Sequence, residues 1–170
     1  MSISNHASTR SNGETSSLNR PRAWDTILYG GLAVGVLDAL DAIIFFGLQG
    51  VAPVRIFQHI ASGLLGRASF GGGSATALLG LLLHFLIAFI LAAIYYGVSL
   101  RFPALIRRAV LCGLLYGVAV YFVMNYLVVP LSAAPNVSAP PAVFLNGLLA
   151  HALLVGLPIA LLARRSAQAK

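Results

Sequence analysis

Apolar residues fall into long blocks that short polar or proline-rich segments separate. A helix that crosses the roughly 30 Å hydrocarbon core of a bilayer needs about 20 such residues. Residues 109–163 contain no Lys, Arg, Asp or Glu but are too long for one crossing, and a proline cluster at 130–141 divides them because proline disfavours helix. The pattern therefore predicts an all-α membrane protein with four transmembrane helices, at about residues 26–48, 75–97, 109–129 and 143–163.

A shorter segment at about 53–66 is predicted to be an amphipathic helix between the first two spans. Arg55, Gln58, His59 and Ser62 follow the i, i+3, i+4, i+7 spacing and share one helical face, and apolar residues occupy the other. A helix of this length is too short to cross the membrane. It is expected to lie in the interface or to cap the bundle, and the alternative is a lid or a partner-docking element.

Composition supports a lipid environment. Hydrophobic residues make up 59% of the 170-residue chain and charged residues 9%, whereas a soluble domain is about a quarter charged. Residues 1–25 are polar and are expected to form a disordered cytoplasmic tail, followed by a transmembrane domain at 26–165 and a second cytoplasmic tail at 166–170. The glycine run 71–73 lacks the Lys-Ser/Thr of a phosphate-binding loop and is interpreted as a flexible hinge.

The basic residues predict the orientation of the chain. Arg55 and Arg67 precede the second span on one side, and the other nine basic residues flank the spans on the opposite side: Arg10, Arg20, Arg22, Arg101, Arg107, Arg108, Arg164, Arg165 and Lys170. The positive-inside rule places both ends in the cytoplasm. Because these residues border apolar runs rather than gather on one folded face, the bilayer is the expected partner and nucleic acid is not.

Two short patterns recur along the chain and suggest a tandem two-helix repeat. A GxxxG sequence in spans one and three alternates with a GxxxH sequence in spans two and four. Glycines four apart allow helix backbones to approach closely in membranes. The glycines predicted to pack helices together are Gly31, Gly35, Gly80, Gly113, Gly117 and Gly147.

Candidate chemistry is limited to ionisable residues within the spans, which are costly in lipid and therefore informative. These residues are Asp38, Asp41, His84 and His151. Asp38 shares the face of the glycines in its span, and each histidine shares a face with the glycine four residues before it, so all three are expected to point into the bundle. Nearer the outer end of span three, Tyr121 and Asn125 add polar groups.

Three interpretations of this polar centre remain open. Asp38 can form an interhelical hydrogen bond that fixes helix register, or the carboxylates and histidines can form a proton relay or transport site. The third is ligation of haem b by His84 and His151, although no cofactor is predicted as the first choice. We find no catalytic motif and lean against an enzyme. The small size favours a homodimer or a subunit of a membrane complex.

Several stretches are similar to a group of small bacterial four-helix inner-membrane proteins to which no activity is assigned. The resemblance lies in Ile56-Phe57-Gln58, in residues 60–66 and 80–85, in Met124-Asn125-Tyr126 and in residues 156–161. It covers roughly residues 26–165. It implies a location in the bacterial inner membrane and carries over no site residue.

Overall fold

The described part of the chain, residues 20–135 and 140–168 of a computed structural model, is built from helices and contains no strand. The predicted all-α fold with four membrane-spanning helices is confirmed. The spans are Asp25–Gly47, Gly73–Ser99, Ala109–Leu131 and Pro141–Gln168. In chain order the elements are η1 (Asp25–Tyr29), α1 (Gly30–Gly47), α2 (Pro53–Leu65), η2 (Gly66–Gly71), α3 (Gly73–Ser99), α4 (Ala104–Arg107), α5 (Ala109–Val123), η3 (Met124–Val128), α6 (Val129–Leu131), α7 (Pro141–Ala150), η4 (His151–Gly156) and α8 (Leu157–Gln168).

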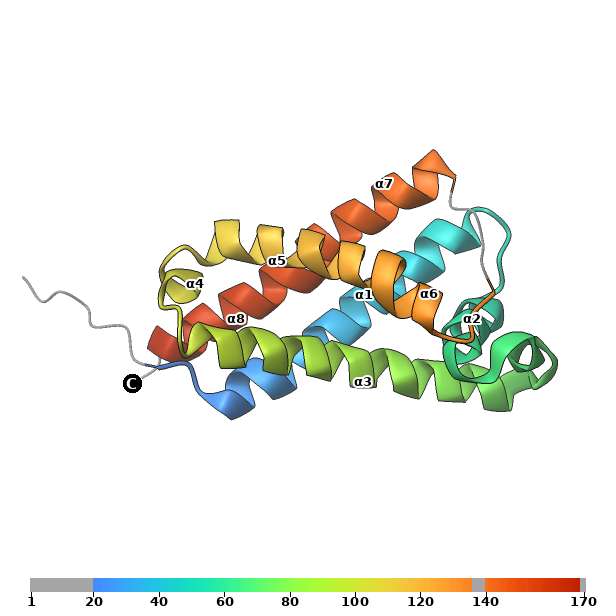
Figure 1. The fold of residues 1–170 in the computed structure, drawn as a ribbon, viewed down its shortest axis with the longest axis horizontal. Coiled ribbons are helices and arrows are strands. Elements are labelled where there is room, and N and C mark those ends of the chain that lie inside the picture. Colours follow the sequence, from blue (N-terminus) through green and yellow to red (C-terminus); the bar gives the residue numbers. More distant parts are fainter. Residues whose placement is uncertain (1–19, 136–139, 169–170) are drawn as a thin grey trace, which may run out of the picture.

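The four spans lie side by side along the long axis of the molecule, with α1 and the α7–α8 helix oblique to α3 and α5 (Figure 1). Helix α2 and η2 occupy one end, and α4 lies at the other end with the last turns of α8 (Figure 1). We call these the α2 end and the arginine end. Arg20 and Arg22 precede η1 at the arginine end, five further arginines belong to the α3–α5 connection and to α8, and Arg55 and Arg67 lie at the α2 end.

Small residues fill the core at the arginine end. The cluster there includes Ala92, Ala109, Ala160 and Ala163, each fully buried, around the ring of Tyr95. Lipid gives helices little hydrophobic reason to associate, so close van der Waals contact between small residues has to hold them together. The sequence therefore forms this bundle by its alanines and glycines, while large apolar side chains such as Leu82 and Leu115 face outward.

Each GxxxG sequence contacts the span that follows it in the chain. Gly31 and Gly35 lie against the rings of Phe89 and Phe85, which belong to α3. In the second hairpin, Gly113 contacts α8 and the end of η4, and the backbone of Gly117 meets that of His151 and the following residue. The remaining two predicted packing glycines differ, since Gly80 contacts the α2 backbone and Gly147 contacts the Tyr121 ring. The two helix hairpins of the suggested repeat therefore agree in the contacts of their GxxxG glycines. They differ in the contacts of Gly80 and Gly147.

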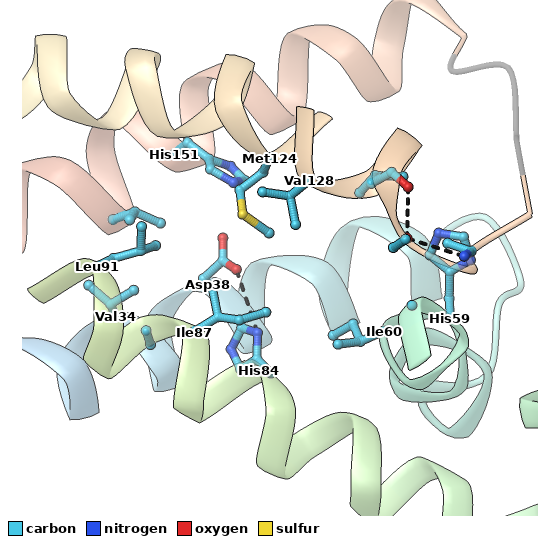
Figure 2. A pocket seen from close by; sticks show the side chains of 16 residues that line it. Val34, Asp38, His59, Ile60, His84, Ile87, Leu91, Met124, Val128 and His151 are labelled. Carbon is cyan, nitrogen blue, oxygen red and sulfur yellow. Dashed lines mark hydrogen bonds and ion pairs between the residues drawn. The ribbon is translucent and has the colours of Figure 1, made fainter. Parts of the chain in front are cut away.

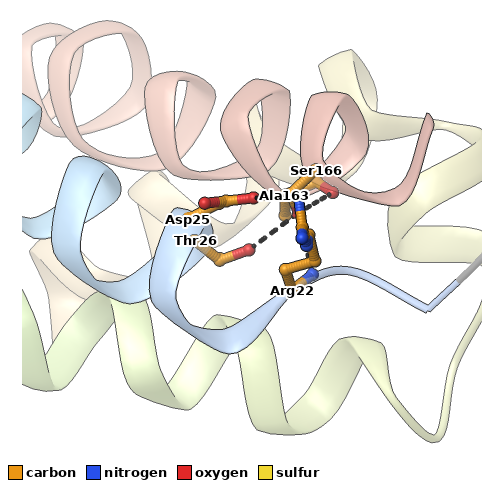
Figure 3. Close-up of polar contacts among 5 residues, drawn as sticks. All are labelled: Arg22, Asp25, Thr26, Ala163 and Ser166. Atoms are coloured by element: carbon orange, nitrogen blue, oxygen red, sulfur yellow. Dashed lines mark hydrogen bonds and ion pairs between the residues drawn. The ribbon is translucent and has the colours of Figure 1, made fainter. Parts of the chain in front are cut away.

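Buried hydroxyl groups join the first and last spans at the arginine end (Figure 3). The Ser166 hydroxyl donates to the carbonyl of Ala163 at 2.9 Å and accepts from the backbone N–H of Arg22 at 3.2 Å. Because its one hydrogen is used, the Thr26 hydroxyl at 3.1 Å donates to it. Helix α8 continues through Gln168, so residues 166–168 of the tail expected at 166–170 belong to the last helix, and residues 169–170 lie outside the described residues.

The first helix begins before residue 25, the predicted limit of the N-terminal tail. Residues 1–19 of the predicted tail 1–25 lie outside the described residues. Ala23 and Trp24 are already helical and lead into η1, so the first helix includes the last residues assigned to the tail. The Thr26 and Ser166 contact explains this early start, because it fixes the first turn against α8.

Helix α2 caps the bundle by packing on α3, which agrees with the first of the two roles expected for it. Only part of its polar face is turned inward: Gln58 and Ser62 are buried, whereas Arg55 and His59 are exposed. Gln58 donates from Nε2 to the carbonyl of Gly73 at 3.0 Å. The backbone N–H of Ala133 donates to the Gly63 carbonyl at 3.0 Å and ties the loop after α6 to this helix.

The glycine run expected as a hinge forms a hydrogen-bonded turn between η2 and α3. The Thr76 hydroxyl donates to the carbonyl of Ser69 at 2.6 Å across this turn. Gly73 adopts φ +60°, a left-handed conformation that only glycine enters at little cost. The glycine run therefore sets the direction in which α3 starts.

Two spans contain a widened π turn a few residues before a proline. Segment η3 precedes Pro130, and η4 precedes Pro158. A proline inside a helix cannot donate to the carbonyl four residues earlier and its ring crowds that carbonyl, so the helix deforms on its N-terminal side. Met124 and His151 are the first residues of these two π turns.

Candidate functional site

A carboxylate and an imidazole face one another between the first two spans. The Oδ2 atom of Asp38 lies 4.0 Å from Nδ1 of His84, and the side chains are 24% and 12% exposed, respectively. Asp38 is residue 14 of the 23 in its span, and His84 is residue 12 of 27. Both residues therefore lie within about 3 Å of mid-span along the helix axis. This depth makes them the least lipid-like pair of groups in the bundle.

The hydrogen bond on the far side of the His84 ring determines its tautomer. Its Nε2 atom lies 2.8 Å from the carbonyl oxygen of Gly35, and because a carbonyl can only accept, Nε2 carries the hydrogen. In the neutral ring, Nδ1 is then an acceptor that faces Asp38. The pair therefore has room for one exchangeable proton between two acceptors, on the carboxylate or on the ring.

The second histidine is arranged in the opposite sense. Nδ1 of His151 lies 2.8 Å from the carbonyl of Gly147, one turn earlier on the same helix, so Nδ1 carries the hydrogen and Nε2 is an acceptor. The Tyr121 ring packs edge-on against the imidazole, with centroids 5.4 Å apart and an 82° angle between planes. His151 is thereby oriented by its own helix on one side and by α5 on the other.

Asp38, His84 and His151 line one pocket of about 260 Å³. Figure 2 shows the three side chains grouped with Met124, while Ile60 and His59 lie toward α2. Toward the arginine end, Val34, Leu91 and Val155 close the pocket and adjoin the buried core. Toward the α2 end, the lining comes from α2 and from the loop after α6, with His59, Gly63, Ser132 and Ala134. The pocket therefore extends from mid-span to the α2 end.

His59 stands at the α2 end of this pocket. The ring of Phe70 lies 6.4 Å from the His59 ring between centroids. Burial of part of the imidazole lowers its pKa below the ordinary value of 6.5. The neutral form of this histidine is therefore favoured at the mouth.

The other sequence-predicted site residues lie apart from this group. Asp41 accepts a hydrogen bond from Nδ2 of Asn146 at 2.9 Å, which ties α1 to α7. Asn125 donates from Nδ2 to the carbonyl of Tyr121 at 2.9 Å, within its own helix. Tyr121 itself is buried and contacts the site through its ring. Asp41 and Asn125 are not among the residues that line the pocket.

Two contributors were missed from the sequence. His59 was assigned to the polar face of α2, and the packing of α2 over the end of the bundle brings it to the edge of the pocket. Met124 looks like an ordinary apolar residue until η3 directs its side chain to the site (Figure 2). Pro130 was the available signal for Met124, because a proline inside an apolar span deforms the helical turn that precedes it.

The residues required for haem ligation are present, but His84 uses the atom that would bind iron. Its Nε2 is engaged by Gly35, so ligation through that atom requires the hydrogen bond to break. Among the described residues, no three His, Cys, Asp or Glu side chains form a group suited to a metal ion. In the geometry as it stands, both histidines form hydrogen bonds to backbone carbonyls.

Comparison with protein-family models, with curated proteins and with solved structures gives no match to this chain.

Proposed function

We propose that this protein is a small bacterial inner-membrane transporter in which Asp38 and His84 exchange a proton at mid-membrane. The observation that carries the proposal is the Asp38–His84 pair, which faces a pocket extending to the α2 end. Carboxylates and imidazoles inside membrane-spanning helices are the groups from which proton relays in pumps and transporters are built. The pair supplies one group of each kind, and they face each other.

A purely structural role for the Asp38–His84 pair is the competing interpretation, and the distance between the two side chains argues against it. A hydrogen bond that fixes helix register needs a short donor–acceptor distance, whereas Nδ1 and the Asp38 oxygen are 4.0 Å apart. Asp41 and Asn146, at 2.9 Å, already provide such a bond between α1 and α7. The looser Asp38–His84 pair is better suited to a changing proton occupancy.

Proton flux in liposomes tests the proposal. Purified protein is reconstituted with a pH-sensitive dye inside, and a potassium gradient with valinomycin sets the membrane potential. We expect wild-type liposomes to acidify faster than protein-free liposomes, and Asp38→Asn to reduce the rate about tenfold or more because an amide cannot take up the proton. The matched control is Asp25→Asn, which removes a carboxylate at the arginine end, 3.9 Å from Arg22. Flux that survives in Asp38→Asn at the wild-type rate would reject the relay.

The orientation proposed for the chain places the arginine end in the cytoplasm. Seven described arginines lie there against two at the α2 end, and the positive-inside rule assigns the richer side to the cytoplasm. A fluorescent protein fused after Lys170 folds only in the cytoplasm and is expected to be bright. Alkaline phosphatase at the same position is active only outside and should be inactive. The reverse pattern would overturn the orientation.

A further inference from the structure

The polar side chains at mid-pocket offer acceptors. Nδ1 of His84 and Nε2 of His151 have no hydrogen in the neutral rings, because in each ring the other nitrogen donates to a backbone carbonyl. A carboxylate such as that of Asp38 only accepts when it is ionised. Ser132 uses its hydroxyl hydrogen on the carbonyl of Val129 at 2.7 Å, and its oxygen accepts from the N–H of Ala134 at 3.2 Å, so it has no hydrogen to offer a ligand. A ligand at mid-pocket is therefore met by acceptors on several sides.

Such a lining selects the chemistry of the ligand. An anion, or a neutral ligand that offers carbonyl oxygens, would bring further acceptors to groups that need donors. Mg²⁺ and Ca²⁺ require about six or more oxygen ligands, whereas Asp38 is the one carboxylate that lines the pocket. The remaining candidates are cations that carry several N–H donors of their own.

The apolar part of the lining adds a second condition. Ile87, Leu91, Val128 and Val155 surround the acceptors. A strongly hydrated metal cation would lose its water shell there without replacement, whereas the alkyl group of an organic ammonium ion gains from burial in apolar surroundings. A volume of about 260 Å³ lies just below the range of sites for drug-sized ligands, so the ligand is a small molecule.

The pocket reaches the α2 end. Val34, Leu91 and Val155 line its other end and adjoin the buried core, and His59 and Gly63 line it where α2 covers the bundle. The lowered pKa of His59 keeps this ring uncharged near neutral pH, so it does not repel a cation. The guanidinium of Arg55 stacks on the Phe70 ring, 5.6 Å from its centroid, and does not line the pocket.

We propose that the pocket binds ammonium or a small primary alkylammonium ion, whose N–H groups donate to the Asp38 carboxylate and to Nε2 of His151. The inference rests on the proposed function, since Asp38 serves in both, and it names the substrate class of that site. The ion enters from the α2 end and places its alkyl group among the apolar side chains. Proton release from the ammonium group to His84 would then couple the ligand to the relay.

Binding of radiolabelled methylammonium to the purified protein in detergent tests the inference by a scintillation proximity assay. Unlabelled methylammonium is expected to displace the label, and tetramethylammonium is expected to displace it at least about tenfold less well, because it has the same charge but no N–H donor. This comparison uses the wild-type protein alone and needs no variant to fold. Equal competition by the two ions would overturn the donor argument, and absence of saturable methylammonium binding would overturn the inference.

Two aspartate variants test whether methylammonium binds at Asp38. Asp38→Asn is expected to weaken methylammonium binding about ten- to a hundredfold, since a hydrogen bond to a charged group is lost together with the counter-charge. Asp25→Asn should bind as wild type, and unchanged binding in Asp38→Asn would place the ligand elsewhere and overturn the inference. Proton flux without any amine is measured on the same preparations. Flux without methylammonium binding rejects the substrate class alone, whereas binding without flux rejects the proposed proton relay.

Discussion

Replacing Gly117 with alanine is expected to abolish the folded bundle or to destabilise it by roughly 3 kcal/mol. A methyl group at this position would overlap the backbone of His151 and Ala152, and backbone cannot move aside as a flexible side chain can. The α5 and η4 helices would have to separate, and lipid supplies little hydrophobic force to hold them at the larger distance. Thermal unfolding in detergent, followed by size-exclusion chromatography, measures the loss.

Gly97→Ala is the matched control for this prediction. Gly97 also lies in a membrane-spanning helix, and a methyl group there would meet nothing within 4 Å. Alanine favours helix over glycine by about 1 kcal/mol, so this variant should be as stable as wild type or more stable. Equal stability of Gly117→Ala and Gly97→Ala would contradict the close contact between α5 and η4.

Replacing Gly80 with alanine is expected to detach α2 while the four spans stay assembled. The added methyl group would overlap the carbonyl of Phe57 and come within 3.2 Å of the Ala61 nitrogen, both on the α2 backbone. Because α2 is a short cap, it can move away without separating the membrane-spanning helices. Hydrogen exchange followed by mass spectrometry should show α2 amides exchanging roughly ten- to a hundredfold faster, with little change in the core of α3.

The control for Gly80 lies on α2 itself. A methyl group at Gly63 would sit 3.8 Å from the Ser132 side chain, an ordinary contact distance, so Gly63→Ala should leave exchange in α2 unchanged or slower. If Gly80→Ala protects α2 as well as wild type does, the cap is not held through this contact. If it unfolds all four spans, α2 is required for the bundle.

The four spans could be predicted because the features that produce them are local in the sequence. Hydropathy and the bilayer thickness determine length, and the proline cluster determines where the long apolar run divides. The start of α2 at Pro53 follows from the tolerance of a first helical turn for proline. These are local causes, and one sequence is sufficient to see them.

The pairing of individual side chains could not be predicted in the same way. The sequence places Asp38 and His84 at similar depth, but the bond between His84 and Gly35 depends on how α1 is rotated against α3. Asp41 was grouped with Asp38 because both interrupt one span, yet they are three residues apart and reach different partners. Rotation about the helix axis is determined by packing across the bundle, which spacing within one helix does not contain.

The contact between Thr26 and Ser166 can form only late in synthesis, because it joins the first membrane-spanning helix to the last. The two residues are separated by 140 positions, so at ribosomal rates of about 5–20 residues per second the first span waits about 7–28 s for its partner. During that interval Thr26 has no Ser166 to bond, and Asp38 meets His84 before it meets His151. The contact between the first and last spans at the arginine end therefore forms only after α8 has been made.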